Sequence, residues 1–203
     1  MKQALIERIY DATHTLASKS INQGFSRLED PIPAAFQQQG LYLFLDRAIP
    51  RTNAKSSKII RVGITGINNS QRLSQHRSGN MESSIFRKHV GRSISAKNNR
   101  IATELEVSQY LHPLEYVFLP VSNESLLRQL EKNLIAVISN YGLTNPLDKP
   151  ADNWLGFQQN RNTNQAIASS HLWNVHYVKR FEDENILTYE NSINNFQSLI
   201  EKI

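Results

Sequence analysis

The chain of 203 residues contains no cysteine, which excludes disulfide bonds and metal sites built on thiolates. It also lacks a long apolar run at its start. The first twenty residues carry Lys2, Glu7, Arg8, Asp11 and Lys19 among their hydrophobic side chains, so we expect neither a signal peptide nor a membrane span there. Hydrophobic residues still make up 39% of the chain, which is enough for a core. A folded protein of the cytoplasm is therefore the default expectation.

Acidic residues are almost missing from one stretch of the chain. Between residues 47 and 100, twelve lysines and arginines accompany a single acid, Glu82, so this stretch carries +11 while the whole chain carries +5. Such a block repels itself, and a polyanion would compensate it. No basic amphipathic helix with an apolar insertion face is evident, so nucleic acid is favoured over a membrane. A solvated basic surface without a partner is the alternative. The residues expected to bind phosphates are Arg47, Arg51, Lys55, Lys58, Arg77, Arg87, Lys88, Arg92, Lys97 and Arg100.

Three short apolar runs rich in β-branched and aromatic residues predict strands at residues 41–45, 59–64 and 114–119. The segment that joins the first two, residues 46–58, is long for a hairpin loop, and loops of that length are usually functional or mobile. Apolar residues at helical spacing predict helices at 1–20, 83–91, 101–110, 123–140 and from 183 onward. Residues 93–99 are expected to be a polar connection, and residues 172–178 a further strand or a docking segment.

These elements predict an α+β fold in which a small, mainly antiparallel three-stranded sheet is flanked by helices. Helical extensions are expected at both ends. The expected division is an N-terminal helix and linker (1–38), a central domain (39–147) and a C-terminal extension packed on that domain (148–203).

Glu131 is the most informative single residue. On the predicted helix 123–140, the leucines and isoleucines define one apolar arc, and at 100° per residue Glu131 falls inside it. Burying a carboxylate there is costly unless a cation or hydrogen-bond donors meet it. Glu131 is therefore either part of a structural salt bridge, for example with Arg72, or a ligand for a divalent metal, which hard oxygen ligands suit.

Arg72 and His76 are four residues apart and share a face of a short predicted helix that Ser70 would cap. A guanidinium can hold a phosphate through two parallel hydrogen bonds and stabilise developing negative charge. An imidazole can relay a proton or hold a phosphate in place. An Arg–His pair on a solvated surface is the alternative interpretation.

Five sequence features occur in a fixed order: Gly40-Leu41-Tyr42, Arg61-Val62-Gly63, Arg72-x-x-x-His76, Glu131 and Asn145. This order resembles that of the GIY-YIG nuclease family, with the first two features as its two signatures. The resemblance implies a DNA endonuclease, with RNA not excluded, that uses one Mg²⁺ or Mn²⁺ held by Glu131. It further implies that Tyr42 activates or positions water and that Asn145 lies near the site. A core tyrosine and a turn residue before Pro146 are the alternatives for these two positions.

The second signature departs from the family pattern at Arg61, where a tyrosine is usual. Either Arg61 is a second phosphate contact, or the protein is a weakened or altered enzyme; a cationic group beside Tyr42 would also help to ionise it. Two other functions remain open. A non-catalytic nucleic-acid-binding protein would use the same basic surface, and a structural protein would use Glu131 and Arg72 as a buried ion pair. Oligomeric state and substrate specificity are not encoded in these patterns.

Overall fold

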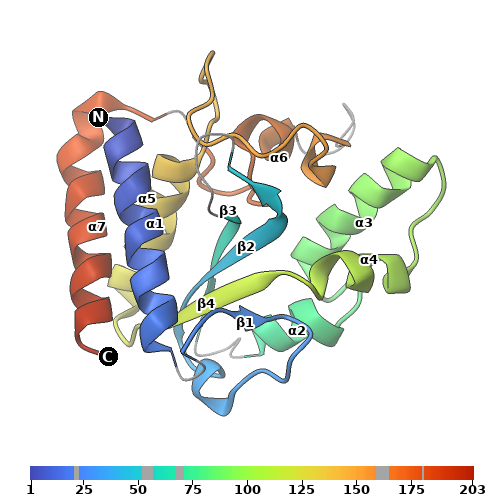
Figure 1. The fold of residues 1–203 in the computed structure, drawn as a ribbon, viewed down its shortest axis with the longest axis horizontal. Helices are drawn as coiled ribbons and strands as arrows, with labels where there is room; N and C mark the ends of the chain where they lie inside the picture. The colour runs from blue at the N-terminus through green and yellow to red at the C-terminus, as the bar shows by residue number, and fades with distance from the viewer. Residues whose placement is uncertain (21–22, 52–56, 67–70, 159–164, 180) are drawn as a thin grey trace.

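An antiparallel sheet forms the centre of a computed structural model that describes residues 1–20, 23–51, 57–66, 71–158, 165–179 and 181–203. Its strands are β1 (Ser26–Arg27), β2 (Gly40–Pro50), β3 (Ser57–Thr65) and β4 (Glu115–Pro120), in the order β1-β4-β2-β3. The expected α+β fold with a small antiparallel sheet is confirmed (Figure 1). The short strand β1 is an addition to the three expected strands, and it pairs with β4.

Helices cover both faces of the sheet, as Figure 1 shows. On one face lie α1 (Lys2–Lys19), α5 (Glu124–Ile138) and α7 (Ile186–Glu201). On the other lie α2 (Arg72–Ser78), α3 (Ile85–Asn98) and α4 (Glu104–Leu111). The remaining short elements are η1 (Ala34–Phe36), η3 (Leu155–Gln158), α6 (Gln165–Ser170) and η4 (Asp183–Asn185).

Alternation along the strands separates two cores, because successive side chains of a strand point to opposite faces. From β2, Leu41, Leu43 and Leu45 join the core under α1, α5 and α7, whereas Tyr42 and Phe44 join the core under α2, α3 and α4. Both terminal helices thus pack on the first core. The division of the chain into three segments stays a prediction.

A register shift in β3 changes this alternation where the second signature lies. Phe44 pairs with Arg61 and Leu45 with Ile59, which leaves Ile60 without a cross-strand partner. An extra residue of this kind re-aims the side chains of its strand. The extra residue puts Ile60 on the same face of the sheet as its neighbour Arg61. Arg61 itself keeps the regular register with Phe44 and so shares the face of Tyr42, and its guanidinium carbon lies 4.8 Å from the centre of the Phe86 ring.

The two signatures meet across β2 and β3, where Tyr42 pairs with Gly63. A Cβ atom at Gly63 would collide with the ring and hydroxyl of Tyr42. The glycine of the second signature is therefore required by the tyrosine of the first.

Two helix predictions were wrong in detail. The residues expected to connect two helices, 93–99, continue α3 as far as Asn98, because Ile94 extends its apolar face and Asn99 ends it in the left-handed conformation (φ 50°). The helix predicted over 101–110 is α4, which begins only at Glu104. Its Val107 and Leu111 face the core, whereas Leu105 and the preceding Ile101 (87% exposed) point to solvent. A capping box between Thr103 and Glu106 starts α4 at Glu104, and this start determines which side chains of the helix face the core.

Residues 172–178 form a docking segment. Trp173 donates its backbone N–H to the Ile60 carbonyl (2.7 Å). The Asn174 side chain both accepts from the Val62 N–H (3.1 Å) and donates to the Val62 carbonyl (2.7 Å). These bonds occupy the outer edge of β3 in place of a fifth strand. Of the helices in the described parts of the chain, none is long and apolar enough to cross a membrane.

Candidate functional site

A cavity of about 310 Å³ opens at the outer edge of β3. Its charged lining comes from three separate elements: Arg61 of β3, Arg72 of α2 and Glu131 of α5. The remaining lining residues are Ile85, His89, Ile135, Asn174, Val175, His176 and Tyr177. The fold therefore brings three of the residues expected at the site into one cavity.

Glu131 is half-buried, and its carboxylate forms no hydrogen bond or ion pair with any residue that the structure describes. Burial raises the pKa of Glu131, and the charges of Arg61, Arg72 and Arg128 oppose this shift only in part. A carboxylate with unused oxygen atoms in this setting is a candidate ligand for a hard cation.

Arg61 and Arg72 supply positive charge to the same cavity. Arg61 donates from Nη1 to the Trp173 carbonyl (2.6 Å). The Nε atoms of both arginines are buried, and among the described residues neither has a hydrogen-bond partner. Buried N–H donors without a partner are uncommon. The two guanidinium charges at the lining of the cavity would attract an anion.

Tyr42 and His76 lie beneath the cavity and do not line it. The Tyr42 hydroxyl is 3.0 Å from Nε2 of His76, and Nδ1 of His76 is 2.8 Å from Oγ of Ser84. Burial lowers the pKa of His76 well below its usual range, and the charges of Arg61, Arg72 and Arg87 lower it further. At neutral pH the imidazole is therefore neutral, so that one nitrogen donates a hydrogen bond and the other accepts one.

Asn145 lies on the exposed loop that follows α5 and does not line the cavity. The asparagine that does so is Asn174, which also docks its segment on β3. Asn174 is not among the site residues that the sequence predicts. The sequence feature that could have identified it is a polar residue between two apolar ones, Trp173 and Val175.

Three of the basic residues expected to bind phosphates are buried in ion pairs. Arg51 and Lys58 both contact Asp148, through Nε of Arg51 (2.7 Å) and Nζ of Lys58 (2.8 Å). Arg51 also pairs with Glu7 (2.6 Å). Since Arg51, Lys58 and Asp148 are almost fully buried, this cluster is structural, and these two cations have no surface from which to reach DNA.

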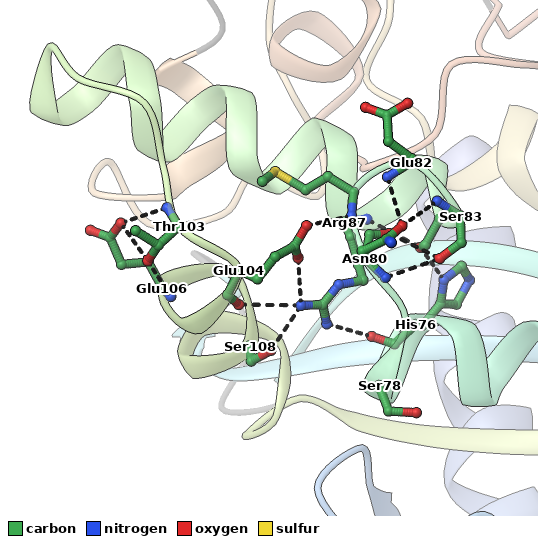
Figure 2. Close-up of polar contacts among 12 residues, drawn as sticks. His76, Ser78, Asn80, Glu82, Ser83, Arg87, Thr103, Glu104, Glu106 and Ser108 are labelled. Atoms are coloured by element: carbon green, nitrogen blue, oxygen red, sulfur yellow. Dashed lines mark hydrogen bonds and ion pairs between the residues drawn. The ribbon is translucent and has the colours of Figure 1, made fainter.

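Arg87 is the third buried cation, and it ties α3 to α2 and α4 (Figure 2). Its Nη1 donates to the His76 carbonyl (3.1 Å), and its Nη2 donates to the Glu104 carboxylate (3.0 Å) and the Ser108 hydroxyl (2.8 Å). The charge pattern predicts Arg87 as a phosphate ligand, but the residue is buried. Its acidic partner Glu104 explains why it is inside.

The other residues expected to bind phosphates differ in their exposure and in whether they form ion pairs. Arg92 and Lys97 are exposed on α3 and form no ion pair with a described residue. The remaining basic residues form ion pairs or hydrogen bonds but keep partial or full exposure: Arg47 with Glu115, Lys88 with Glu82, Arg100 with Glu106, and Arg77 with the Glu29 carbonyl. Lys55 and the expected cap Ser70 lie outside the described residues.

The GIY-YIG domain family matches residues 1–103 and 95–199 of the chain, which together span nearly the entire sequence. No curated protein and no solved structure matches this chain.

Proposed function

The chain belongs to the GIY-YIG domain family, and on that premise we propose that it is an endonuclease that hydrolyses phosphodiester bonds of DNA at the cavity beside β3. The family supports a nuclease-type function with a nucleic-acid substrate. One observation supports the placement of the reaction: Arg61, Arg72 and Glu131, from three elements, line a single cavity.

The donor set of the cavity fits a divalent metal bound largely through water and substrate. Among the described residues, no group of three or more histidine, aspartate or glutamate side chains could hold a metal on its own. Mg²⁺ does not need such a group, because it keeps several waters and binds through one or two carboxylates together with phosphate oxygens. Glu131, with its unpaired carboxylate, would hold Mg²⁺ or Mn²⁺ here. When bound, the metal would neutralise phosphate charge and stabilise the leaving oxygen.

The two arginines bind and orient the phosphate. Arg72 and Arg61 donate to the non-bridging oxygens, and their charge stabilises the negative charge that develops as water attacks phosphorus. The Arg61 guanidinium is held in place by the Trp173 carbonyl and by the Phe86 ring. In this proposal the arginine of the second signature is a phosphate contact rather than a defect.

Tyr42 and His76 position the attacking water. The neutral His76 accepts a hydrogen bond from the Tyr42 hydroxyl at Nε2, 3.0 Å away, and this bond orients the phenol oxygen to accept a hydrogen bond from the water. Because Tyr42 does not line the cavity, this role requires a side-chain movement that brings its oxygen to the water. Asn145 is exposed away from the cavity, so we give it no part in the reaction.

Nicking of a supercoiled plasmid in the presence of Mg²⁺ tests the proposal. We expect the wild-type protein to nick, and Glu131→Gln and Arg72→Ala to lose nicking while still retaining DNA on a filter. Glu124→Gln is the matched control, because Glu124 lies on the same helix but is exposed and does not line the cavity. Equal nicking by the wild type and Glu131→Gln would refute the assignment.

A second candidate is a nucleic-acid-binding protein without catalysis. The burial of Tyr42 beneath the cavity and the arginine at position 61 favour it. It predicts salt-dependent DNA binding with no nicking by any variant.

A further inference from the structure

The docking segment passes from one core to the other across the outer edge of β3. Val175 packs against the core that contains Trp173, and Val178 packs against the core that contains Leu172. His176 and Tyr177 lie at the crossing, where both are exposed and both line the cavity. The positions of His176 and Tyr177 are set by the packing of Val175 and Val178 on either side, since their own side chains are exposed.

Tyr177 adopts a left-handed backbone conformation with φ 61°. This conformation is costly for a bulky residue, and it persists only where neighbouring structure imposes it. The Asn174 bonds to Val62 fix the chain before Tyr177, and Val178 fixes it afterwards. The strained residue therefore presents a ring that is 40% exposed at the rim of the cavity.

The surroundings of Tyr177 suit the sugar–phosphate backbone. Arg128, three residues before Glu131 on α5, lies near enough to Tyr177 to add positive charge on that side. Arg72 lines the same cavity. A volume of about 310 Å³ is near the lower limit of cavities that hold small ligands, roughly 300–1,000 Å³. A cavity of this size would accommodate one nucleotide with its phosphate but not a duplex.

We propose that Tyr177, with His176 beside it, is a stacking platform for an unpaired nucleobase next to the phosphate in the cavity. This inference rests on the proposed nuclease function and names its substrate class: DNA with unpaired nucleotides at the site of cleavage. In a duplex, neighbouring bases cover both faces of each base, so an aromatic side chain at this rim can stack only on a base that has left the helix.

Stacking depends on the ring of Tyr177 and not on its hydroxyl, which separates this role from acid–base catalysis. Tyr177→Phe should retain it, whereas Tyr177→Ala should lose it. Tyr177→Gly removes the ring and also relieves the left-handed backbone, so it should melt at or above the wild-type temperature. Loss of binding in that variant cannot be assigned to misfolding.

Fluorescence anisotropy measures the effect with two labelled DNA duplexes of equal length, one fully paired and one with a central bubble of mismatched bases. Both carry the same number of phosphates, and binding is measured in EDTA at one fixed salt concentration. The full-length wild type should bind the bubble about fivefold or more tightly than the paired duplex. Tyr141→Ala is the matched control, because Tyr141 is 41% exposed but does not line the cavity.

We expect Tyr177→Ala and Tyr177→Gly to lose the preference for the bubble, and Tyr177→Phe and Tyr141→Ala to keep it. The proposal is overturned if the wild type shows no preference, or if Tyr177→Gly keeps it. Because binding is measured without metal, the result is independent of nicking. A protein that prefers the bubble but never nicks would refute the nuclease function and support the stacking platform.

Discussion

Asp148 is the acid on which two buried cations depend, and its replacement by asparagine tests how the basic stretch is divided between structure and binding. Asp148 accepts from Nε of Arg51 and Nζ of Lys58, and also from the Tyr10 hydroxyl (3.0 Å). Tyr10 in turn accepts from the backbone N–H of Ile59. The cluster therefore joins α1, the residue after β2, β3 and the loop after α5. Asp148→Asn leaves Arg51 with one carboxylate partner, Glu7, and leaves Lys58 with none among the described residues.

Removing one partner of a buried ion pair costs about 3–5 kcal/mol, because the remaining charge is left uncompensated. For a domain of this size each kcal/mol corresponds to about 2–4 °C in melting temperature. We therefore expect Asp148→Asn to melt about 6–20 °C below the wild type at neutral pH, measured by circular dichroism. Asp152→Asn is the matched control: Asp152 is nearby and pairs with Lys149, but its side chain is 88% exposed, so its loss should be nearly neutral.

The same variant has a characteristic pH dependence. Burial alone would raise the pKa of Asp148, but Lys58 and Arg51 outweigh it and hold the pKa below its usual range. This contribution to stability is fully present above the ordinary aspartate pKa of about 4 and is lost as the pH falls through the lowered value. The melting temperatures of the wild type and Asp148→Asn should therefore converge in acid. An unchanged melting temperature at neutral pH, with altered DNA affinity, would show that Arg51 and Lys58 bind DNA after all.

Three further outcomes are expected. Without metal, Glu131→Gln should melt above the wild type by calorimetry, since burial disfavours the charged carboxylate; a lower melting temperature would contradict this. Gly63→Ala should cost about 1–3 kcal/mol in chemical denaturation because its Cβ collides with the signature tyrosine, whereas Gly66→Ala, with open space around it, should cost far less. The double variant Arg92→Ala/Lys97→Ala should weaken DNA binding and reduce the salt slope by about 2; an unchanged slope would remove α3 from the DNA-binding surface.

The elements were predictable where apolar periodicity was strong. The strands around Tyr42 and Val117 and the two terminal helices follow directly from spacing, because that spacing is what packs them on a sheet. The helical arc that contains Glu131 likewise predicted its partial burial. The role of Glu131 stays a prediction, as do those of Arg72 and Tyr42.

What failed depends on contacts between residues far apart in the chain. Counting charges cannot reveal that Lys58 lies against Asp148 or that Arg87 lies against Glu104, so buried cations were taken for a binding surface. The register shift at Ile60 has no local sequence signal, yet it puts two consecutive residues, Ile60 and Arg61, on the same face of the sheet. Asn174 was missed at the site because its pairing with β3 is made by a side chain, outside any strand pattern.

The packing of α1 and α7 on one face of the sheet has a practical consequence for expression of this protein. The two helices pack side by side and, with α5, cover the same leucines of β2 (Figure 1). A shortened version limited to residues 39–147 would present that apolar face to water, and would also lack Trp173 and Asn174 along the outer strand. Recombinant fragments trimmed to the signature motifs should therefore collect in inclusion bodies, and crystallisation trials should begin from the entire chain.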